Sequence, residues 1–340
     1  MSFKRDLALV GIGHWGKNLA RNFNQLNALH TICDTHSLHL GQCQKLYPHV
    51  SFTDTFDTIL KNPEIKKVAV VVPTAFHYEF AKKAIEHGKD VFVEKAMSSN
   101  AGEAFELYTT AKEKNKILMV GHILHYHPCI ERIKEMIQTG DLGDLLHLQF
   151  NRLNFGSRGP ETSALWAFAP HDISILLGFC ESYPLETVHC MQQSFYSKDH
   201  FDQSWLSLSF SQNVKASIHV NWMNPVPERR LTIVGTKGTL VFDDLKDWGE
   251  KLTFWENSVS KKGSYLQFNQ RAEEKIMLEP KEPLHEECKH FLDCCKNRSE
   301  PITSGLEGFR VMKVLDLASK SSKLNKILNY EESARELLKL

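Results

Sequence analysis

Short apolar runs alternate with segments of helical periodicity over the first third of the chain. Helical spacing is clear at Leu19, Phe23 and Leu26, and two more helices are expected, at about 78–87 before Gly88 and from a cap at 98–100 to about 114. This alternation predicts a parallel sheet with helices on both faces, since its strands are buried on both sides. The apolar runs that predict these strands are residues 7–10, 31–33, 68–72, 91–93 and 117–120.

The pattern changes after Gly121. A helix is expected at about 128–139, and strand-like segments then follow one another without helices between them, which predicts a largely antiparallel sheet with one face buried. Residues 308–324 are helical again and are a candidate to pack back on the first domain. The alternating segments are residues 145–150, 205–210, 216–220, 231–234 and 240–242.

Length and pattern together predict two domains. The chain has 340 residues, which is the usual size of a two-domain protein. Because the pattern changes at Gly121, we expect an α/β protein with a first domain of residues 1–121 and a second, larger domain of residues 122–340.

Composition excludes several classes of protein. Hydrophobic residues make up 42% of the chain, so it can bury a core. The 41 basic and 41 acidic residues balance, which argues against a nucleic-acid-binding or polybasic membrane-binding surface. No apolar run reaches the roughly 20 residues of a membrane span, and the start lacks the apolar stretch of a signal peptide. A cytoplasmic location is therefore expected.

The eight cysteines are scattered and are typical of buried thiols in a reducing compartment. One cluster, at residues 285–295, combines histidine, glutamate and cysteine. It lacks the paired spacing of zinc sites, so we expect no metal. An apolar helical stripe explains it better, made by Leu284, Cys288, Phe291, Leu292 and Cys295.

A glycine-rich turn directly follows the first predicted strand and opens the first helix. Glycine allows the tight turn, the approach of a pyrophosphate and close packing of helix on strand, while the helix N-terminus offers unpaired N–H groups. With both neighbours in place, the motif predicts a Rossmann dinucleotide-binding domain. Its residues are Gly11, Ile12, Gly13, His14, Trp15 and Gly16.

Asp34 ends the second predicted strand. A carboxylate there would accept hydrogen bonds from both hydroxyls of an adenosine ribose and repel a 2′-phosphate, so NAD is expected as the cofactor rather than NADP. The alternative interpretation is a turn or cap residue before Ser37.

Several motifs together resemble the Gfo/Idh/MocA oxidoreductase family, over essentially the whole chain. Glu94-Lys95-Ala96 stands where the family has Glu-Lys-Pro. The resemblance implies a C-terminal α/β domain whose open sheet faces substrate and mediates homodimer or homotetramer contacts. The other residues that carry it are the glycine-rich turn, Asp34 and the segment Pro73-Thr74-Ala75-Phe76-His77.

A closer similarity is to the branch of nucleotide-sugar 3-dehydrogenases and 3-ketoreductases. These enzymes prepare UDP-N-acetylglucosamine or its uronic acid for 3-amination. The resemblance implies NAD-dependent oxidation of the sugar 3-hydroxyl in surface polysaccharide or lipid A biosynthesis, together with a PLP-dependent aminotransferase. The segments concerned are Gly121-His122, Tyr126-His127-Pro128, and residues 152–156, 165–172 and 229–235.

Lys95 and His171 are the predicted catalytic residues. Lys95 follows a strand at the carboxyl edge of the sheet, where the oxidised nicotinamide ring and partial desolvation would lower its pKa toward that of a general base. His171 follows Pro170, and we expect it at a helix N-terminus, which would keep it neutral and able to share the substrate proton. Asp172 either joins this relay, since Ala167 replaces an aspartate common in the family, or only favours the helix dipole.

The remaining candidates border the two ligands. Pro73, Thr74, His77 and Glu94 are expected near the cofactor, although His77 could be only a helix-start residue. Two arginines suit a diphosphate because a guanidinium binds oxygens in a bidentate fork. The expected sugar-nucleotide contacts are Tyr126, His127, Arg152, Asn154, Arg158 and Asp172.

Two classes of function therefore compete. Retention of Lys95 and His171 favours an NAD-dependent enzyme. The alternatives within this class are a 3-ketoreductase and a dehydrogenase of another sugar or a cyclitol. Ala96 and Ala167 depart from the family pattern and favour a non-catalytic NAD-binding regulator on the same fold.

Overall fold

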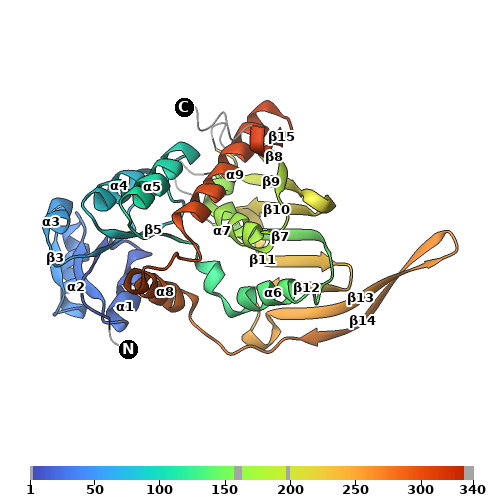
Figure 1. The fold of residues 1–340 in the computed structure, drawn as a ribbon, viewed down its shortest axis with the longest axis horizontal. Helices are drawn as coiled ribbons and strands as arrows, with labels where there is room; N and C mark the ends of the chain where they lie inside the picture. The colour runs from blue at the N-terminus through green and yellow to red at the C-terminus, as the bar shows by residue number, and fades with distance from the viewer. Residues whose placement is uncertain (1–2, 157–162, 197–199, 333–340) are drawn as a thin grey trace. The chain divides into compact units, whose positions relative to one another are not determined.

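The computed structural model describes residues 3–156, 163–196 and 200–332 (Figure 1). The chain divides into two compact units, Met1–Tyr126 with Glu282–Met312, and His127–Lys281 with Lys313–Leu340. This division differs from the predicted boundary at Gly121, because helix α8 (Pro283–Asn297) and the start of α9 (Gly305–Leu324) belong to the first unit.

The first unit contains a six-stranded sheet in the order β3-β2-β1-β4-β5-β6. Every strand pair is parallel, so the predicted fold class is confirmed. The strands are β1 (Leu7–Val10), β2 (Leu29–Cys33), β3 (Ser51–Thr53), β4 (Lys67–Val70), β5 (Asp90–Glu94) and β6 (Leu118–Gly121). The helices between them are α1 (Gly16–Gln25), α2 (Ser37–Leu46), α3 (Phe56–Lys61), α4 (His77–Glu86) and α5 (Ala101–Glu113).

Helix α8 returns to the first unit because its apolar stripe completes that unit's core. The Phe291 ring lies 6.4 Å from the Phe23 ring of α1 and 5.8 Å from the Phe92 ring of β5, both in edge-on geometry. The predicted stripe is confirmed, since Leu284, Cys288, Phe291, Leu292 and Cys295 are all buried.

The second unit is built on a nine-stranded sheet in the order β14-β13-β12-β11-β7-β10-β9-β8-β15. Its neighbours are antiparallel except for β7 and β10, which are parallel. The strands are β7 (Leu145–Phe155), β8 (Leu185–Gln193), β9 (Gln203–Phe210), β10 (Lys215–Asn221), β11 (Met223–Gly235), β12 (Gly238–Asp243), β13 (Leu252–Lys262), β14 (Tyr265–Lys275) and β15 (Leu328–Asn329).

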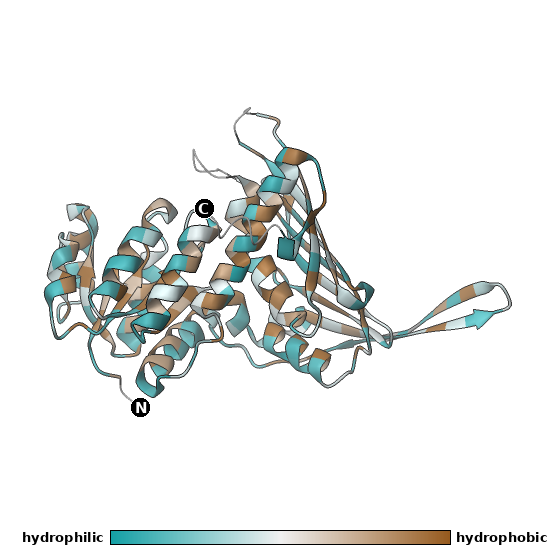
Figure 2. Cartoon of the chain, turned by 45° about the horizontal axis from the view of Figure 1, so that its top comes forward, coloured by the Kyte–Doolittle hydropathy of each residue, from teal (hydrophilic) through white to brown (hydrophobic). Residues whose placement is uncertain are grey.

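Helices α6 (Pro128–Gln138) and α7 (Ala164–Phe179) also belong to this unit, and α7 packs against β7, β9 and β10. Apolar side chains such as Leu148, Phe150 and Ile218 are buried. Strands β13 and β14 continue beyond the sheet as a hairpin (Figure 1), along which hydrophobic and hydrophilic residues are mixed (Figure 2). No helix within the described residues is both long enough and apolar enough to span a membrane.

Candidate functional site

The glycine-rich turn connects β1 to α1 in the first unit. Gly11 has a φ of +97°, and a Cβ there would stand 2.5 Å from the carbonyl oxygen of Val71, so only glycine fits. A Cβ on Gly16 would collide with the carbonyl oxygen of Gly11. A Cβ on Gly13 would meet no atom within 4 Å, so the turn leaves open space at this position.

The N-terminus of α1 suits an anion. No side chain caps it, and its first turn holds no acidic residue. The unpaired N–H groups and the positive end of the helix dipole are therefore available beside the open space at Gly13, as a pyrophosphate requires. His14 and Trp15 are exposed at the same turn.

Asp34 follows β2 directly and is held against the glycine-rich turn. Its Oδ2 accepts a hydrogen bond from the backbone N–H of Ile12 at 2.7 Å, and its Oδ1 accepts one from the N–H of His36 at 2.8 Å. The carboxylate is partly exposed, so it remains accessible to ribose hydroxyls. The Asp34 carboxylate can therefore bind ribose hydroxyls while it also accepts hydrogen bonds from the backbone of the turn.

Glu94 is the last residue of β5, and Lys95 follows it. The indole N–H of Trp15 donates to Glu94 Oε1 at 2.6 Å, and the backbone N–H of Lys95 donates to Oε2 at 3.2 Å. Burial raises the pKa of Glu94, and the Trp15 hydrogen bond opposes this rise. The half-buried Lys95 is joined to Ala96 by a cis peptide bond.

His77 is buried at the start of α4, and its predicted place beside the cofactor stays a prediction. It is 1% exposed, and its ring nitrogens lie 2.6 Å from the carbonyl oxygen of Ala96 and 2.7 Å from that of Val72. The ring thus joins the segments that follow β4 and β5, and His77 begins α4, as the alternative interpretation held. Pro73 and Thr74, by contrast, are exposed.

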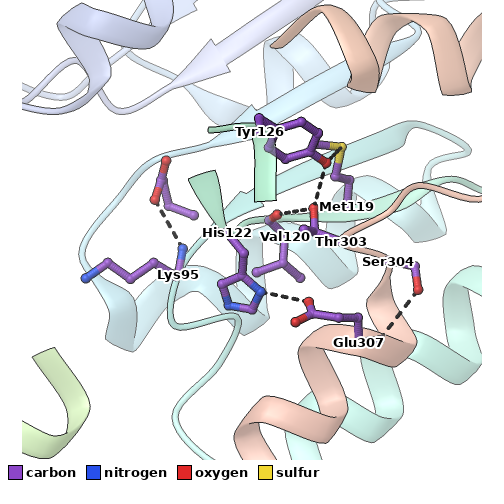
Figure 3. A network of polar contacts seen from close by, with 9 residues as sticks. Lys95, Met119, Val120, His122, Tyr126, Thr303, Ser304 and Glu307 are labelled. Carbon is purple, nitrogen blue, oxygen red and sulfur yellow. Dashed lines mark hydrogen bonds and ion pairs between the residues drawn. The ribbon is translucent and has the colours of Figure 1, made fainter. Parts of the chain in front are cut away.

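A buried polar network lies to one side of Lys95 (Figure 3). His122 Nδ1 lies 2.7 Å from Glu307 Oε2, and Figure 3 shows the Lys95 side chain pointing away from this pair. The sequence could not predict the pair, because its residues are far apart in the chain.

Tyr126 belongs to the same network. It is 3% exposed, and its hydroxyl lies 3.1 Å from Thr303 Oγ1, which in turn donates to the carbonyl oxygen of Val120 at 2.7 Å. Its polar atom is therefore buried and already bonded, and its contact with the sugar nucleotide stays a prediction.

His171 and Asp172 lie in α7 of the second unit, but not at its N-terminus. The helix begins at Ala164, capped by Ser163, and Pro170 stands inside it. The prediction that a helix N-terminus acts on His171 or Asp172 is therefore wrong. Arg152 binds Asp172 through a bidentate fork, with Nε to Oδ2 at 3.0 Å and Nη2 to Oδ1 at 2.6 Å.

This ion pair bears on the predicted roles of both residues. The Arg152 fork is directed at Asp172, and the Asp172 carboxylate joins the helix that carries His171 to β7. The contact of Arg152 with a diphosphate and the part of Asp172 in a proton relay stay predictions. Asn154 lies partly exposed two residues further along β7, and Arg158 lies outside the described residues.

The His127 side chain is also buried, within the second unit. Its Nδ1 accepts a hydrogen bond from the N–H of Cys129 at 3.1 Å and caps α6, while its ring stacks on Trp248 at 5.1 Å. Burial lowers the pKa of His127 to about 4. The predicted contact of His127 with the sugar nucleotide stays a prediction.

Trp222 is a candidate site residue that the sequence reasoning missed. It directly follows β10, whose Val220 and Asn221 pair with Arg152 and Leu153. It is 8% exposed, and its Nε1 has no hydrogen-bond partner among the described residues. An unpaired donor beside the Arg152 ion pair could bind a substrate oxygen. Its only sequence signal is a tryptophan ending an alternating strand.

The first unit thus brings together the glycine-rich turn, Asp34, Trp15, Glu94 and Lys95. The second unit brings together Arg152, Asp172 and His171, with Trp222 at the adjacent strand end. Among the described residues, no group of His, Cys, Asp or Glu is arranged to hold a metal ion.

Comparison with known proteins agrees with this division. The family model described as the oxidoreductase family with an NAD-binding Rossmann fold matches residues 5–122, and the model of the GFO/IDH/MocA C-terminal domain matches residues 130–241. The oxidoreductase YhhX of Escherichia coli is 24% identical over 202 residues, a match that covers 58% of each chain.

Two further similarities concern sugar enzymes. The UDP-N-acetylglucosamine 3-dehydrogenase of Acidithiobacillus ferrooxidans is 24% identical over 66% of this chain and 69% of its own. Its solved structure has a TM-score of 0.79 at 20% identity, covering 94% of this chain and 98% of that one. A levoglucosan dehydrogenase solved with NADH and L-sorbose has a TM-score of 0.83 at 18% identity, covering 97% and 99%.

Proposed function

Because the chain belongs to the Gfo/Idh/MocA oxidoreductase family and carries its NAD-binding Rossmann domain, we propose that it is an enzyme that oxidises the sugar 3-hydroxyl of a UDP-N-acetylhexosamine to a 3-keto sugar. The observation that carries the proposal is the joint position of Asp34, the glycine-rich turn and Lys95 at the carboxyl ends of β2, β1 and β5. Parallel sheets bind ligands at this edge.

The residues of the first unit fit NAD. The open space at Gly13 and the uncapped start of α1 suit the pyrophosphate. Asp34 is already oriented by two backbone N–H groups, and its remaining lone pairs suit the adenosine ribose hydroxyls. When bound, NAD supplies the acceptor for the hydride that leaves the sugar carbon.

Lys95 is the proposed base. Oxidation of a secondary alcohol removes a hydride and the hydroxyl proton, and an amine with lone-pair character can take that proton. Glu94 anchors the backbone of Lys95 and so fixes where its side chain starts. His171 is proposed to share the proton from the second unit, on a helix that the Arg152–Asp172 pair holds against β7.

The substrate class rests on one of the relatives, whose solved structure covers 94% of this chain. The A. ferrooxidans enzyme is named for oxidation of UDP-N-acetylglucosamine at position 3. A 3-keto sugar is a substrate for transamination, so we propose that a PLP-dependent aminotransferase acts next, in surface polysaccharide or lipid A biosynthesis. Assembly as a homodimer or homotetramer through the sheet of the second unit is part of the same proposal, as is a cytoplasmic location.

The test is NADH formation, followed by absorbance, with purified protein, NAD and a panel of substrates. The panel contains UDP-N-acetylglucosamine, its uronic acid, dTDP-sugars, free sugars and inositols. An aminotransferase with its amino donor is added to remove the ketone, since 3-oxidation is uphill. Turnover confined to UDP-N-acetylhexosamines supports the proposal. Turnover confined to free sugars or inositols would instead indicate a sugar or cyclitol dehydrogenase.

A further inference from the structure

Trp15 makes a side-chain hydrogen bond that joins two distant segments of the first unit. Its indole N–H donates to Glu94 Oε1 at 2.6 Å, across a separation of 79 residues in the chain. Trp15 lies in the glycine-rich turn after β1, and Glu94 ends β5. Because β4 lies between β1 and β5 in the sheet, no backbone pairing connects these two strands. The tryptophan side chain therefore links segments that the sheet keeps apart.

The backbone of Trp15 is fixed to the start of α1. Its carbonyl oxygen accepts hydrogen bonds from the N–H groups of Asn18 at 2.9 Å and Leu19 at 3.4 Å. The side chain thus starts from the same helix N-terminus that is proposed to hold the pyrophosphate. The Trp15 side chain does not fill the core, since the residue is 39% exposed.

The Glu94 carboxylate is held from three sides. Oε1 accepts the Trp15 bond, and Oε2 accepts a hydrogen bond from the backbone N–H of Lys95 at 3.2 Å. Glu94 is 8% exposed, and a carboxylate this deeply buried needs donors on its oxygens. The third contact is steric, because a Cβ on Gly121 would stand 3.0 Å from the carboxyl carbon and from Oε1. Two donors and the backbone of β6 therefore fix where this carboxylate lies.

We propose that Trp15 is a positioning residue for Lys95: its indole N–H holds the Glu94 carboxylate, and this carboxylate holds the backbone from which the Lys95 side chain starts. The inference rests on the proposed function, in which Lys95 is the base beside the cofactor. Trp15 acts through Glu94 and takes no proton itself.

The physical reason is the precision that a general base requires. The base must lie within hydrogen-bond reach of the hydroxyl proton, and a misplacement of about 1 Å costs about a hundredfold in rate. Lysine carries its amine on a flexible four-carbon stem, so the backbone at the start of the stem must be held. Without the indole donor, Glu94 Oε1 is buried with one bond fewer, and the carboxylate reorients away from the Lys95 N–H. The phosphate-binding turn and the base are thus held in one arrangement.

Hydrogen exchange at the backbone amide of Lys95 measures this link without any substrate. Trp15→Phe keeps an aromatic ring and removes the N–H donor. We expect exchange at the Lys95 amide to become at least about tenfold faster, which corresponds to the loss of one hydrogen bond to a charged group. Trp255→Phe, at a partly exposed position in β13, is the matched control and should leave this exchange unchanged.

Steady-state kinetics show whether the link matters for the reaction. With NAD and the proposed substrate, Trp15→Phe should lower kcat at least about tenfold, while KM for NAD and the Kd of ADP-ribose change less than about threefold. A role confined to holding the start of α1 would instead weaken ADP-ribose binding. Gly121→Ala displaces the same carboxylate from β6 with the indole donor intact, so it should produce the same changes in exchange and kcat.

Two results overturn the inference. The first is unchanged exchange at Lys95 in Trp15→Phe, and the second is faster exchange with an unchanged kcat. If the unaltered protein oxidises none of the substrates in the panel, the proposed function fails, and the exchange measurement still decides on its own whether Trp15 holds the backbone of Lys95.

Discussion

Arg152 and Asp172 form a two-point ion pair that joins β7 to α7, with both nitrogen–oxygen contacts at 3.0 Å or less. The Asp172 side chain is 5% exposed and that of Arg152 is 16% exposed, so water screens the pair weakly. His171 directly precedes Asp172 in the helix. The ion pair therefore fixes the segment that presents the proposed proton-sharing histidine.

Asp172→Asn should destabilise the protein, because it leaves the Arg152 guanidinium buried without its hydrogen-bonded counter-charge. The expected loss is about 3 kcal/mol, measured by urea unfolding. Glu135→Gln breaks the exposed Arg132–Glu135 pair and is the matched control, with a loss below about 1 kcal/mol. Equal effects of the two substitutions would mean that burial of the Arg152 pair contributes nothing.

Gly13→Ala should separate cofactor binding from folding. Its Cβ meets no protein atom within 4 Å, so stability changes little, but it occupies the space proposed for the pyrophosphate and weakens NAD binding at least about tenfold. Gly16→Ala instead collides with the backbone of Gly11 and lowers both binding and stability. Fluorescence titration with NADH and a thermal melt distinguish the two; unchanged NADH affinity in Gly13→Ala would contradict the placement of the cofactor.

Asp34→Ala should weaken NAD binding and relax discrimination against NADP. The substitution removes the acceptor for the ribose and the acceptor for two backbone N–H groups, which costs about tenfold to a hundredfold in affinity. The Kd values for NAD and NADP, measured with wild type and variant, give the preference ratio. If the ratio is unchanged, a residue other than Asp34 recognises the ribose.

Acid should destabilise the second unit through His127. Burial lowers its pKa to about 4, below the ordinary value near 6.5. Between these two values the unfolded chain binds a proton that the folded protein does not, so stability falls as the pH falls, by up to about 1.4 kcal/mol per pH unit. His127→Asn keeps a capping side chain but should flatten this slope, whereas His87→Asn, at an exposed position, should leave the slope unchanged.

The periodicity of the sequence was sufficient for the fold class, although it did not predict strands β3, β8, β13, β14 and β15. Strand runs such as 68–72 and 91–93 became neighbouring parallel strands β4 and β5, because a strand buried on both faces must be apolar throughout. The glycine-rich turn was equally predictable, since its backbone conformation and close approach to Val71 require specific residues.

The features that the sequence did not predict have physical causes. Pro170 suggested a helix start, yet the cap at Ser163 begins α7 about two turns earlier, and the proline is accommodated inside the helix. A sequence does not show burial, so the buried positions of Tyr126 and His127 could not be read from it. Glu287 lies in an apolar stripe, and its burial depends on the return of α8 to the first unit.

The initial rate of NADH formation from NAD and UDP-N-acetylglucosamine, or its uronic acid, in Lys95→Met tests the central claim most directly. Methionine keeps much of the length and apolar character of the lysine stem but cannot accept a proton. We predict a rate at least about a hundredfold below wild type, with NAD affinity changed by less than about threefold. Turnover comparable to wild type, with NAD still bound, would contradict the assignment of Lys95 as the base.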